Sequence, residues 1–132
     1  MIFGSLLLLA AVQDPSFDCD KDETQLALNF CARKDFEETD AALNVQWKKT
    51  YAGMKAQDGE YDMDRRPSDK SLNAAPQLLE SQRAWLKFRD ATCEAEGAGY
   101  RGGSMQPLVI FQCRTKITKE RIAHLEQLIE EY

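Results

Sequence analysis

Apolar side chains recur three or four residues apart through most of the chain, and this spacing constrains the fold most strongly. In the last stretch, the positions that follow it are Leu108, Phe111, Thr115, Thr118, Ile122, Leu125 and Ile129. Positions spaced in this way share one face of an α-helix, whereas a strand brings alternate residues to one face. The sequence therefore predicts long amphipathic helices and no convincing strand.

Four helices are expected, separated by segments rich in glycine or charge. They cover, in order, 24–32, Asp35 to between Gly53 and Gly59, Asn73 to Glu96, and the segment from Ser104 to the C-terminus. The charged stretch 56–71 has no helical period and contains Pro67, so it is predicted to be a loop. Long helices with short connections pack antiparallel. We expect an all-α bundle of three long helices plus a short N-terminal helix.

The first twelve residues, MIFGSLLLLAAV, form an apolar run of the length found in the core of a signal peptide. The run is shorter than the ~20 residues that cross a bilayer. We interpret 1–13 as a signal-peptide-like leader and 14–132 as one domain, periplasmic or secreted, without a membrane span once the leader is removed. No basic residue precedes the run and no clean cleavage site follows it, so a buried apolar helix is the alternative.

The chain has four cysteines, Cys19, Cys31, Cys93 and Cys113, and no two of them form the closely spaced pair of a zinc ribbon or a redox centre. An even number of dispersed cysteines in an exported domain indicates disulfides. Three pairings are possible, and proximity in sequence favours Cys19 with Cys31 and Cys93 with Cys113. Four free thiols in a cytosolic protein are the competing interpretation.

Several polar and aromatic side chains share the apolar faces of the predicted helices. They are Asp40, Asn44, Trp47, Gln82, Trp85 and Arg89. A buried guanidinium needs a partner, and Asp40 is the natural candidate for Arg89. The set is expected to form a structural network that fixes the register of the helices. A polar cleft with aromatic walls, suited to a sugar or a peptide, is the alternative.

Acidic residues are concentrated near the start of the domain. The whole chain has 17 basic and 22 acidic residues, a net charge of −5, which disfavours nucleic acid as a partner. Between Asp14 and Asp40 there are nine acidic residues against three basic ones. Four acids of this stretch, Asp18, Asp20, Asp22 and Glu23, are candidates for steering a basic partner towards the protein. Ordinary solubility is the alternative explanation.

No catalytic or metal site is predicted, and no cofactor is expected. Asp58, Glu60, Asp62 and Asp64 alternate in the predicted loop, but Met63 stands where the turn glycine of a calcium-binding EF-hand loop is needed. The single histidine, His124, lies on a helix flank with no nucleophile assigned to it. Surface carboxylates are abundant, and abundance alone does not indicate the raised pKa of a catalytic acid. We therefore expect a protein that is not an enzyme.

Several motifs together resemble the LprI-like lysozyme-inhibitor N-terminal domain family. They are SFDC at 16–19, TQLALNFC at 24–31, Asp40 with Leu43 and Asn44, SQRAWLKFRDATC at 81–93, GGS at 102–104, and Cys113 followed by Thr118, Arg121 and Leu125. The run from Gln82 to Cys93 is the most specific of them. The chain departs from the family at Trp47, where a tyrosine is usual.

The resemblance implies a small exported bacterial helical domain, of a family in which a named member inhibits lysozyme. It implies a binding module whose partner is a basic lysozyme or another envelope protein, and inhibition would come from occlusion of the glycan cleft. A structural or accessory envelope domain that binds a cell-wall or protein partner without inhibition is the alternative, and a hydrolase is the third, after both of these. A shared fold does not by itself transfer an activity.

Overall fold

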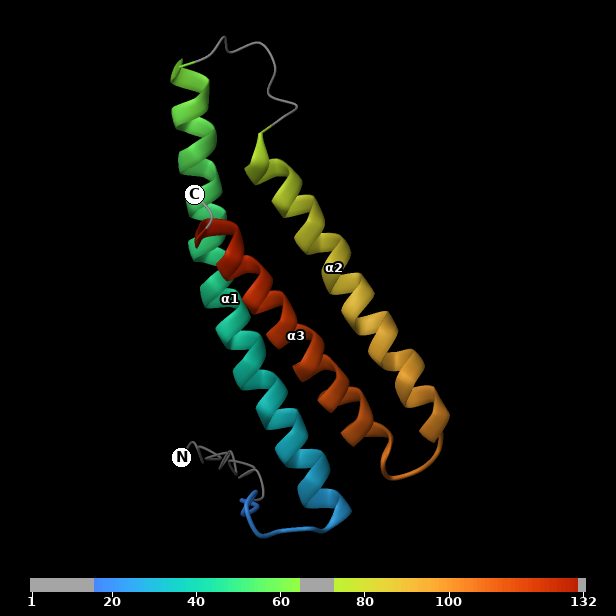
Figure 1. Cartoon of the computed structure of the whole chain (residues 1–132). Helices are drawn as coiled ribbons and strands as arrows, with labels where there is room; N and C mark the ends of the chain where they lie inside the picture. Colours follow the sequence, from blue (N-terminus) through green and yellow to red (C-terminus); the bar gives the residue numbers. More distant parts are fainter. Residues whose placement is uncertain (1–15, 65–72, 131–132) are drawn as a thin grey trace, which may run out of the picture.

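The computed structural model describes residues 16–64 and 73–130, which form three long helices running up, down and up (Figure 1). These are α1 (Gln25–Asp64), α2 (Ala74–Gly97) and α3 (Gln106–Glu130), with a short 3-10 helix η2 (Ala98–Tyr100) after α2. The predicted all-α class and the three long helices are confirmed. The predicted leader lies outside the described residues, and no helix within them is long and apolar enough to cross a membrane.

The first two predicted helices are a single helix, α1, which has 40 residues and is therefore about 60 Å long. The expected break falls at Arg33 and Lys34, which are good helix formers, and no glycine or proline stands nearby to end the helix. The start of the predicted loop, 56–64, is also helical. Ala56, Gln57 and Glu60 are good helix formers even without an apolar stripe, and a lone Gly59 costs only about 1 kcal/mol. The remainder of that predicted loop, 65–71, lies outside the described residues.

The helices face one another along seams in which contacts alternate at three and four residues, as in a coiled coil. The seam positions are Phe36, Asp40, Leu43, Trp47, Thr50 and Met54 on α1; Ala75, Leu78, Gln82, Trp85, Arg89 and Cys93 on α2; and Phe111, Arg114, Thr118, Arg121, Leu125 and Leu128 on α3. α1 packs most extensively against α3. The seam is apolar in one part and polar in another.

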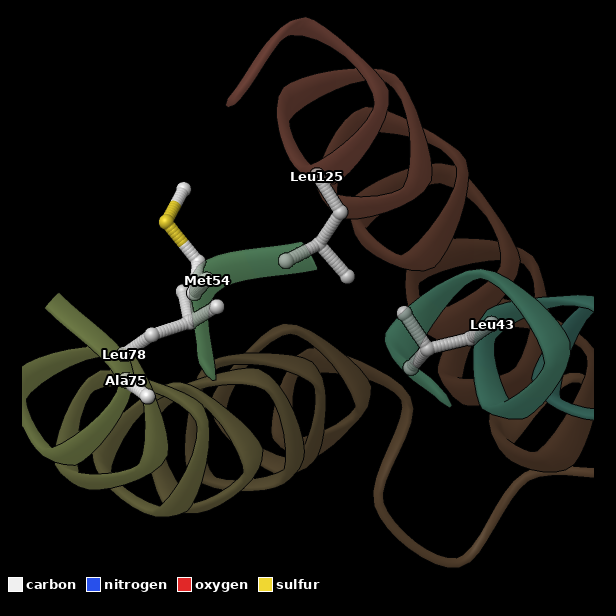
Figure 2. Close-up of a cluster of buried hydrophobic side chains, with 5 residues drawn as sticks. All are labelled: Leu43, Met54, Ala75, Leu78 and Leu125. Atoms are coloured by element: carbon white, nitrogen blue, oxygen red, sulfur yellow. The ribbon is translucent and has the colours of Figure 1, made fainter. Parts of the chain in front are cut away.

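The apolar part of the seam lies in the half of the bundle where α2 begins and α3 ends. Figure 2 shows its buried cluster, in which Leu78 of α2 and Leu125 of α3 lie on either side of Met54 of α1, with Leu43 further along α1. Leu125 is fully buried, and beside it the Thr50 hydroxyl donates to the Leu125 carbonyl at 2.8 Å. This cluster joins all three helices and is the hydrophobic core of the described structure.

The turn between α2 and α3 depends on two glycines in different ways. Gly102 has a φ of 77°, a conformation that glycine adopts without strain. Gly97 is the last residue of α2 and is buried, and a Cβ there would collide with the side chain of Ile110 on α3. Among the glycines of this turn, only Gly102 has a positive φ. Gly97 instead permits the close approach of the two helices.

Both disulfides lie at the same end of the bundle, where α1 begins and where α2 turns into α3 (Figure 1). Cys19 pairs with Cys31 at a Cα–Cα distance of 5.8 Å, and Cys93 pairs with Cys113 at 5.5 Å. The predicted pairing is confirmed. The first disulfide attaches the segment before α1 to that helix, and the second joins α2 to α3. We call this region the crosslinked end.

Candidate functional site

The polar part of the seam is built around the buried side chain of Arg89, of which 7% is exposed. Its Nη1 donates to the Asp40 carboxylate at 2.7 Å and to the Thr118 hydroxyl at 3.3 Å, while Nε donates to Asp90 at 3.0 Å. The three helices therefore meet at one guanidinium. The structure brings Asp40 and Arg89 together as the sequence suggests, and it adds Asp90 and Thr118.

Arginines and aromatic rings alternate along this part of the seam. In spatial order they are Phe111, Arg114, Phe36, Arg89, Trp85 and Arg121. The Arg89 Cζ atom lies 5.1 Å from the Phe36 ring centroid and 5.2 Å from that of Trp85. Contacts of this kind are attractive, and burial strengthens them. The stack fills the space between the helices with flat groups, in which charged guanidinium groups alternate with uncharged aromatic rings.

Arg121 is the second buried guanidinium, and none of its hydrogen-bond partners is a carboxylate. Its Nε donates to the Gln82 side chain at 2.9 Å, Nη2 donates to the Ser81 hydroxyl at 3.1 Å, and Nη1 lies 3.2 Å from His124 Nδ1. Desolvation by burial lowers the pKa of Arg121 from its usual value. Sequence reasoning did not single out Arg121 as a site residue. Its seven-residue spacing from Arg114, on the same face as Leu125, is the signal that could have found it.

The other residues predicted for the network lie in different environments. Gln82 is buried against Arg121, as described above. Trp47 stacks on Tyr51 with a centroid distance of 5.1 Å and packs against the apolar cluster rather than the arginines. Asn44 is exposed, so the expectation that it shares the buried stripe is wrong. The buried polar positions on this part of α1 are Gln46 and Thr50, which are joined by a hydrogen bond of 3.1 Å.

This arrangement fits a structural network better than a solvated ligand cleft, because the polar groups at its centre are occupied by one another. Arg89 is enclosed by two carboxylates, a hydroxyl and two rings. On the outer side, Trp85 and Arg121 do line a hollow of about 310 Å³ with Phe88 and His124. We therefore interpret the network as the device that fixes the register of the three helices.

Asp58 is one of the alternating acids of the predicted loop. It lies within α1 and caps the start of α2. Its two carboxylate oxygens accept the backbone N–H groups of Ala74 and Ala75 at 2.7 and 2.8 Å. The first N–H groups of a helix have no partner within the helix, and negative charge at that end is favourable. Asp58 therefore anchors α2 to α1 across the bundle.

Replacing Asp58 with alanine should lower the free energy of unfolding by about 1 to 2 kcal/mol, the usual range for the loss of a helix cap. Urea unfolding followed by circular dichroism measures this change. Glu60→Ala is the matched control, because Glu60 is an exposed acid two residues along the same helix. Equal effects of the two substitutions would show that the capping contact contributes nothing.

The predicted steering acids lie at the crosslinked end, in the segment that precedes α1. Asp18, Asp20 and Glu23 are exposed and Asp22 is half-buried. Asp18 forms an ion pair with Lys21 at 3.6 Å. The other three have no basic partner within the described residues. Residues 18–23, here called the acidic segment, therefore present uncompensated negative charge beside the Cys19–Cys31 disulfide.

These features define an all-helical, disulfide-crosslinked bundle with a buried arginine network. Residues 18–125 match the family described as Lysozyme inhibitor LprI, and the chain belongs to this family. The family's description names an inhibitor rather than an enzyme. A protein of Rhizobium meliloti (strain 1021), described as Uncharacterized protein R02472, is 38% identical over 122 residues, which cover 92% of this chain and 85% of that protein. No solved structure matches.

Proposed function

We propose that this chain is an exported binding module that inhibits a basic lysozyme by covering its glycan-binding cleft. The observation that carries the proposal is the membership of residues 18–125 in a family described as a lysozyme inhibitor. The two disulfides support an extracytoplasmic location, since such bonds persist in oxidising compartments. A bundle fixed by a buried network and two crosslinks also suits an inhibitor, because a rigid surface loses little entropy on binding.

The charge distribution supports a basic partner. Asp20, Asp22 and Glu23 add negative charge at one end of the molecule, and none of the three forms an ion pair within the described residues, because Lys21 pairs with Asp18. Animal-type lysozymes are basic proteins, so their encounter with this end would be electrostatically favoured. Complementary charge of this kind mainly raises the association rate and contributes less to the strength of the final complex.

The direct test is a cell-wall lysis assay with the purified protein and a panel of lysozymes that differ in net charge. The proposal expects inhibition of basic lysozymes at a protein concentration that also gives saturable binding by surface plasmon resonance. Absence of binding to every lysozyme at micromolar protein would overturn it. The accessory envelope domain, which binds a cell-wall or protein partner without inhibition, would then be the better interpretation.

The association rate with a basic lysozyme should fall as salt is raised, because screening shortens the reach of charges to about 8 Å at physiological ionic strength. Substituting all four predicted steering acids should lower the association rate about three- to tenfold at low salt and change the dissociation rate less. The substitutions are Asp18→Asn, Asp20→Asn, Asp22→Asn and Glu23→Gln. Asparagine at 18 keeps an oxygen for the Asp20 backbone N–H, which the Asp18 carboxylate accepts at 3.1 Å.

A matched control removes the same number of acids elsewhere. Its substitutions are Glu60→Gln, Glu120→Gln, Glu126→Gln and Glu130→Gln, all at exposed positions on α1 and α3. The control should retain most of the association rate, since its charges lie away from the acidic segment. Equal losses in both variants would mean that the total charge, and not its position at the crosslinked end, governs the encounter.

A further inference from the structure

An apolar groove opens on the surface of the crosslinked end, beside the acidic segment. It has a volume of about 300 Å³ and is lined chiefly by Phe17, Leu26, Phe30, Pro107 and Phe111. The Phe17 and Phe30 rings are 5.2 Å apart. Leu26 is 67% exposed, a high value for a large apolar side chain that stands next to other apolar groups. Exposed apolar surface that is contiguous, rather than scattered, marks sites of interaction.

The walls of this groove come from three separate parts of the chain that are firmly joined. The Cys19–Cys31 disulfide attaches Phe17 and its neighbours to α1. The Asn29 amide donates to the Ser104 carbonyl at 2.9 Å, which connects α1 to the turn before α3. The Cys93–Cys113 disulfide fixes the start of α3 against α2. The groove is therefore organised before any partner arrives, which lowers the entropy that binding costs.

The charges around the groove indicate what kind of partner fits it. Asp18 follows Phe17 directly, and Glu23 stands three residues before Leu26, so the chain next to two of the apolar walls carries acids, and both of these are exposed. Arg33 also lines the groove, but its guanidinium is paired with Glu37 at 3.7 Å. An apolar centre with a charged rim is the usual anatomy of a protein interface. The acidic segment beside the groove carries four acids against Lys21, which pairs with Asp18, so the charge next to the groove is net negative and complements a basic surface.

We propose that this groove is the docking surface for the basic lysozyme, with an apolar side chain of the enzyme seated between Leu26 and the phenylalanine rings. Lysine or arginine side chains around that anchor would then contact the acidic segment. The inference rests on the proposed function, and it adds the surface through which that function operates. A buried apolar anchor surrounded by polar contacts is where most binding energy resides in protein complexes.

The test compares two lysine substitutions on α1, Leu26→Lys and Val45→Lys. Both replace an exposed apolar residue, since Leu26 is 67% and Val45 56% exposed, and both add the same charge. The two positions lie about 28 Å apart along the helix. Leu26→Lys should weaken the equilibrium affinity for a basic animal-type lysozyme at least tenfold, whereas Val45→Lys should change it less than twofold. Matching thermal midpoints would establish that both variants are folded.

Hydrogen–deuterium exchange of the wild-type protein with and without lysozyme gives a second measurement that needs no substitution. Protection should appear in 17–30 and 104–111. If the wild type binds lysozyme but Leu26→Lys binds equally well, or protection appears elsewhere, the docking surface is wrong while the proposed function stands. If the wild type binds no lysozyme, the proposed function itself fails. A lysozyme-free dimer that Leu26→Lys abolishes would assign the groove to a second copy of the chain and overturn the inference.

Discussion

Replacing Arg89 with alanine should lower the free energy of unfolding by about 3 kcal/mol, the lower end of the range for removing one member of a buried ion pair, because the Asp40 and Asp90 side chains are 37% and 48% exposed. The substitution removes the cation that pairs with Asp40 at 2.7 Å, whereas Asp90 keeps an ion pair with Arg114 at 3.6 Å. It also empties the space between the Phe36 and Trp85 rings. Equilibrium unfolding in urea measures the loss. Arg83→Ala is the matched control, because Arg83 is an exposed arginine on the same helix.

A double-mutant cycle with Asp40→Ala separates the pair from its surroundings. Asp40→Ala alone should cost less, about 1 to 2 kcal/mol, because the Asp40 side chain is 37% exposed and Arg89 keeps Asp90 and Thr118 as partners. The effects of the two substitutions should not add. Additive losses would show that the 2.7 Å contact between Arg89 and Asp40 contributes little energy, and the network interpretation would have to be abandoned.

Removing the Cys93–Cys113 disulfide by substituting both cysteines with alanine should lower the free energy of unfolding by about 3 kcal/mol. This bond closes a loop of 20 residues between two helices, and both cysteines are buried, with Cys93 fully so. Its loss would let α2 and α3 separate where Gly97 and Ile110 approach closely. Urea unfolding of the double variant, beside the wild type under non-reducing conditions, measures the difference.

The comparison for this prediction is the double alanine variant at Cys19 and Cys31. That bond attaches the segment before α1, which lies outside the apolar cluster, and Cys19 is exposed. Its removal should release the acidic segment from α1 but leave the packing of the three helices intact. The urea midpoint should therefore fall less than it does in the variant at Cys93 and Cys113. A larger loss at Cys19 and Cys31 than at Cys93 and Cys113 would contradict this account of how the two bonds act.

The sequence predicted most of the fold because the helical period of the apolar side chains and the positions of the cysteines are local signals. It did not predict that α1 is continuous. Three consecutive charged residues, 33–35, interrupt the apolar pattern of α1, and such an interruption resembles a helix boundary when only apolar residues are followed. The part of α1 around Asp58 carries little apolar signal of its own. It is held instead by contact with the start of α2, 16 and 17 residues away.

The part of the candidate site that could be predicted from the sequence is the part in which a buried charge requires an opposite charge. A guanidinium on a buried stripe needs a counterion, so Arg89 and Asp40 could be paired from spacing alone. Arg121 finds its hydrogen-bond partners in Gln82, Ser81 and His124, and no rule of charge pairing points to those side chains, since none is a carboxylate. The apolar groove depends on three segments that meet only in the folded chain. Leu26 was therefore indistinguishable in sequence from an ordinary helix residue.

Because both disulfides lie at one end of the bundle, the two ends should differ in how readily the helices separate. Covalent bonds there limit separation of the helices, whereas the opposite end depends on the apolar cluster and the Asp58 cap. Partial opening of a protein begins where the fewest constraints act. Amide protection in the native state should therefore decline along α1 from Cys31 towards Asp64. The end that carries the groove would keep its shape through fluctuations that loosen the rest of the molecule.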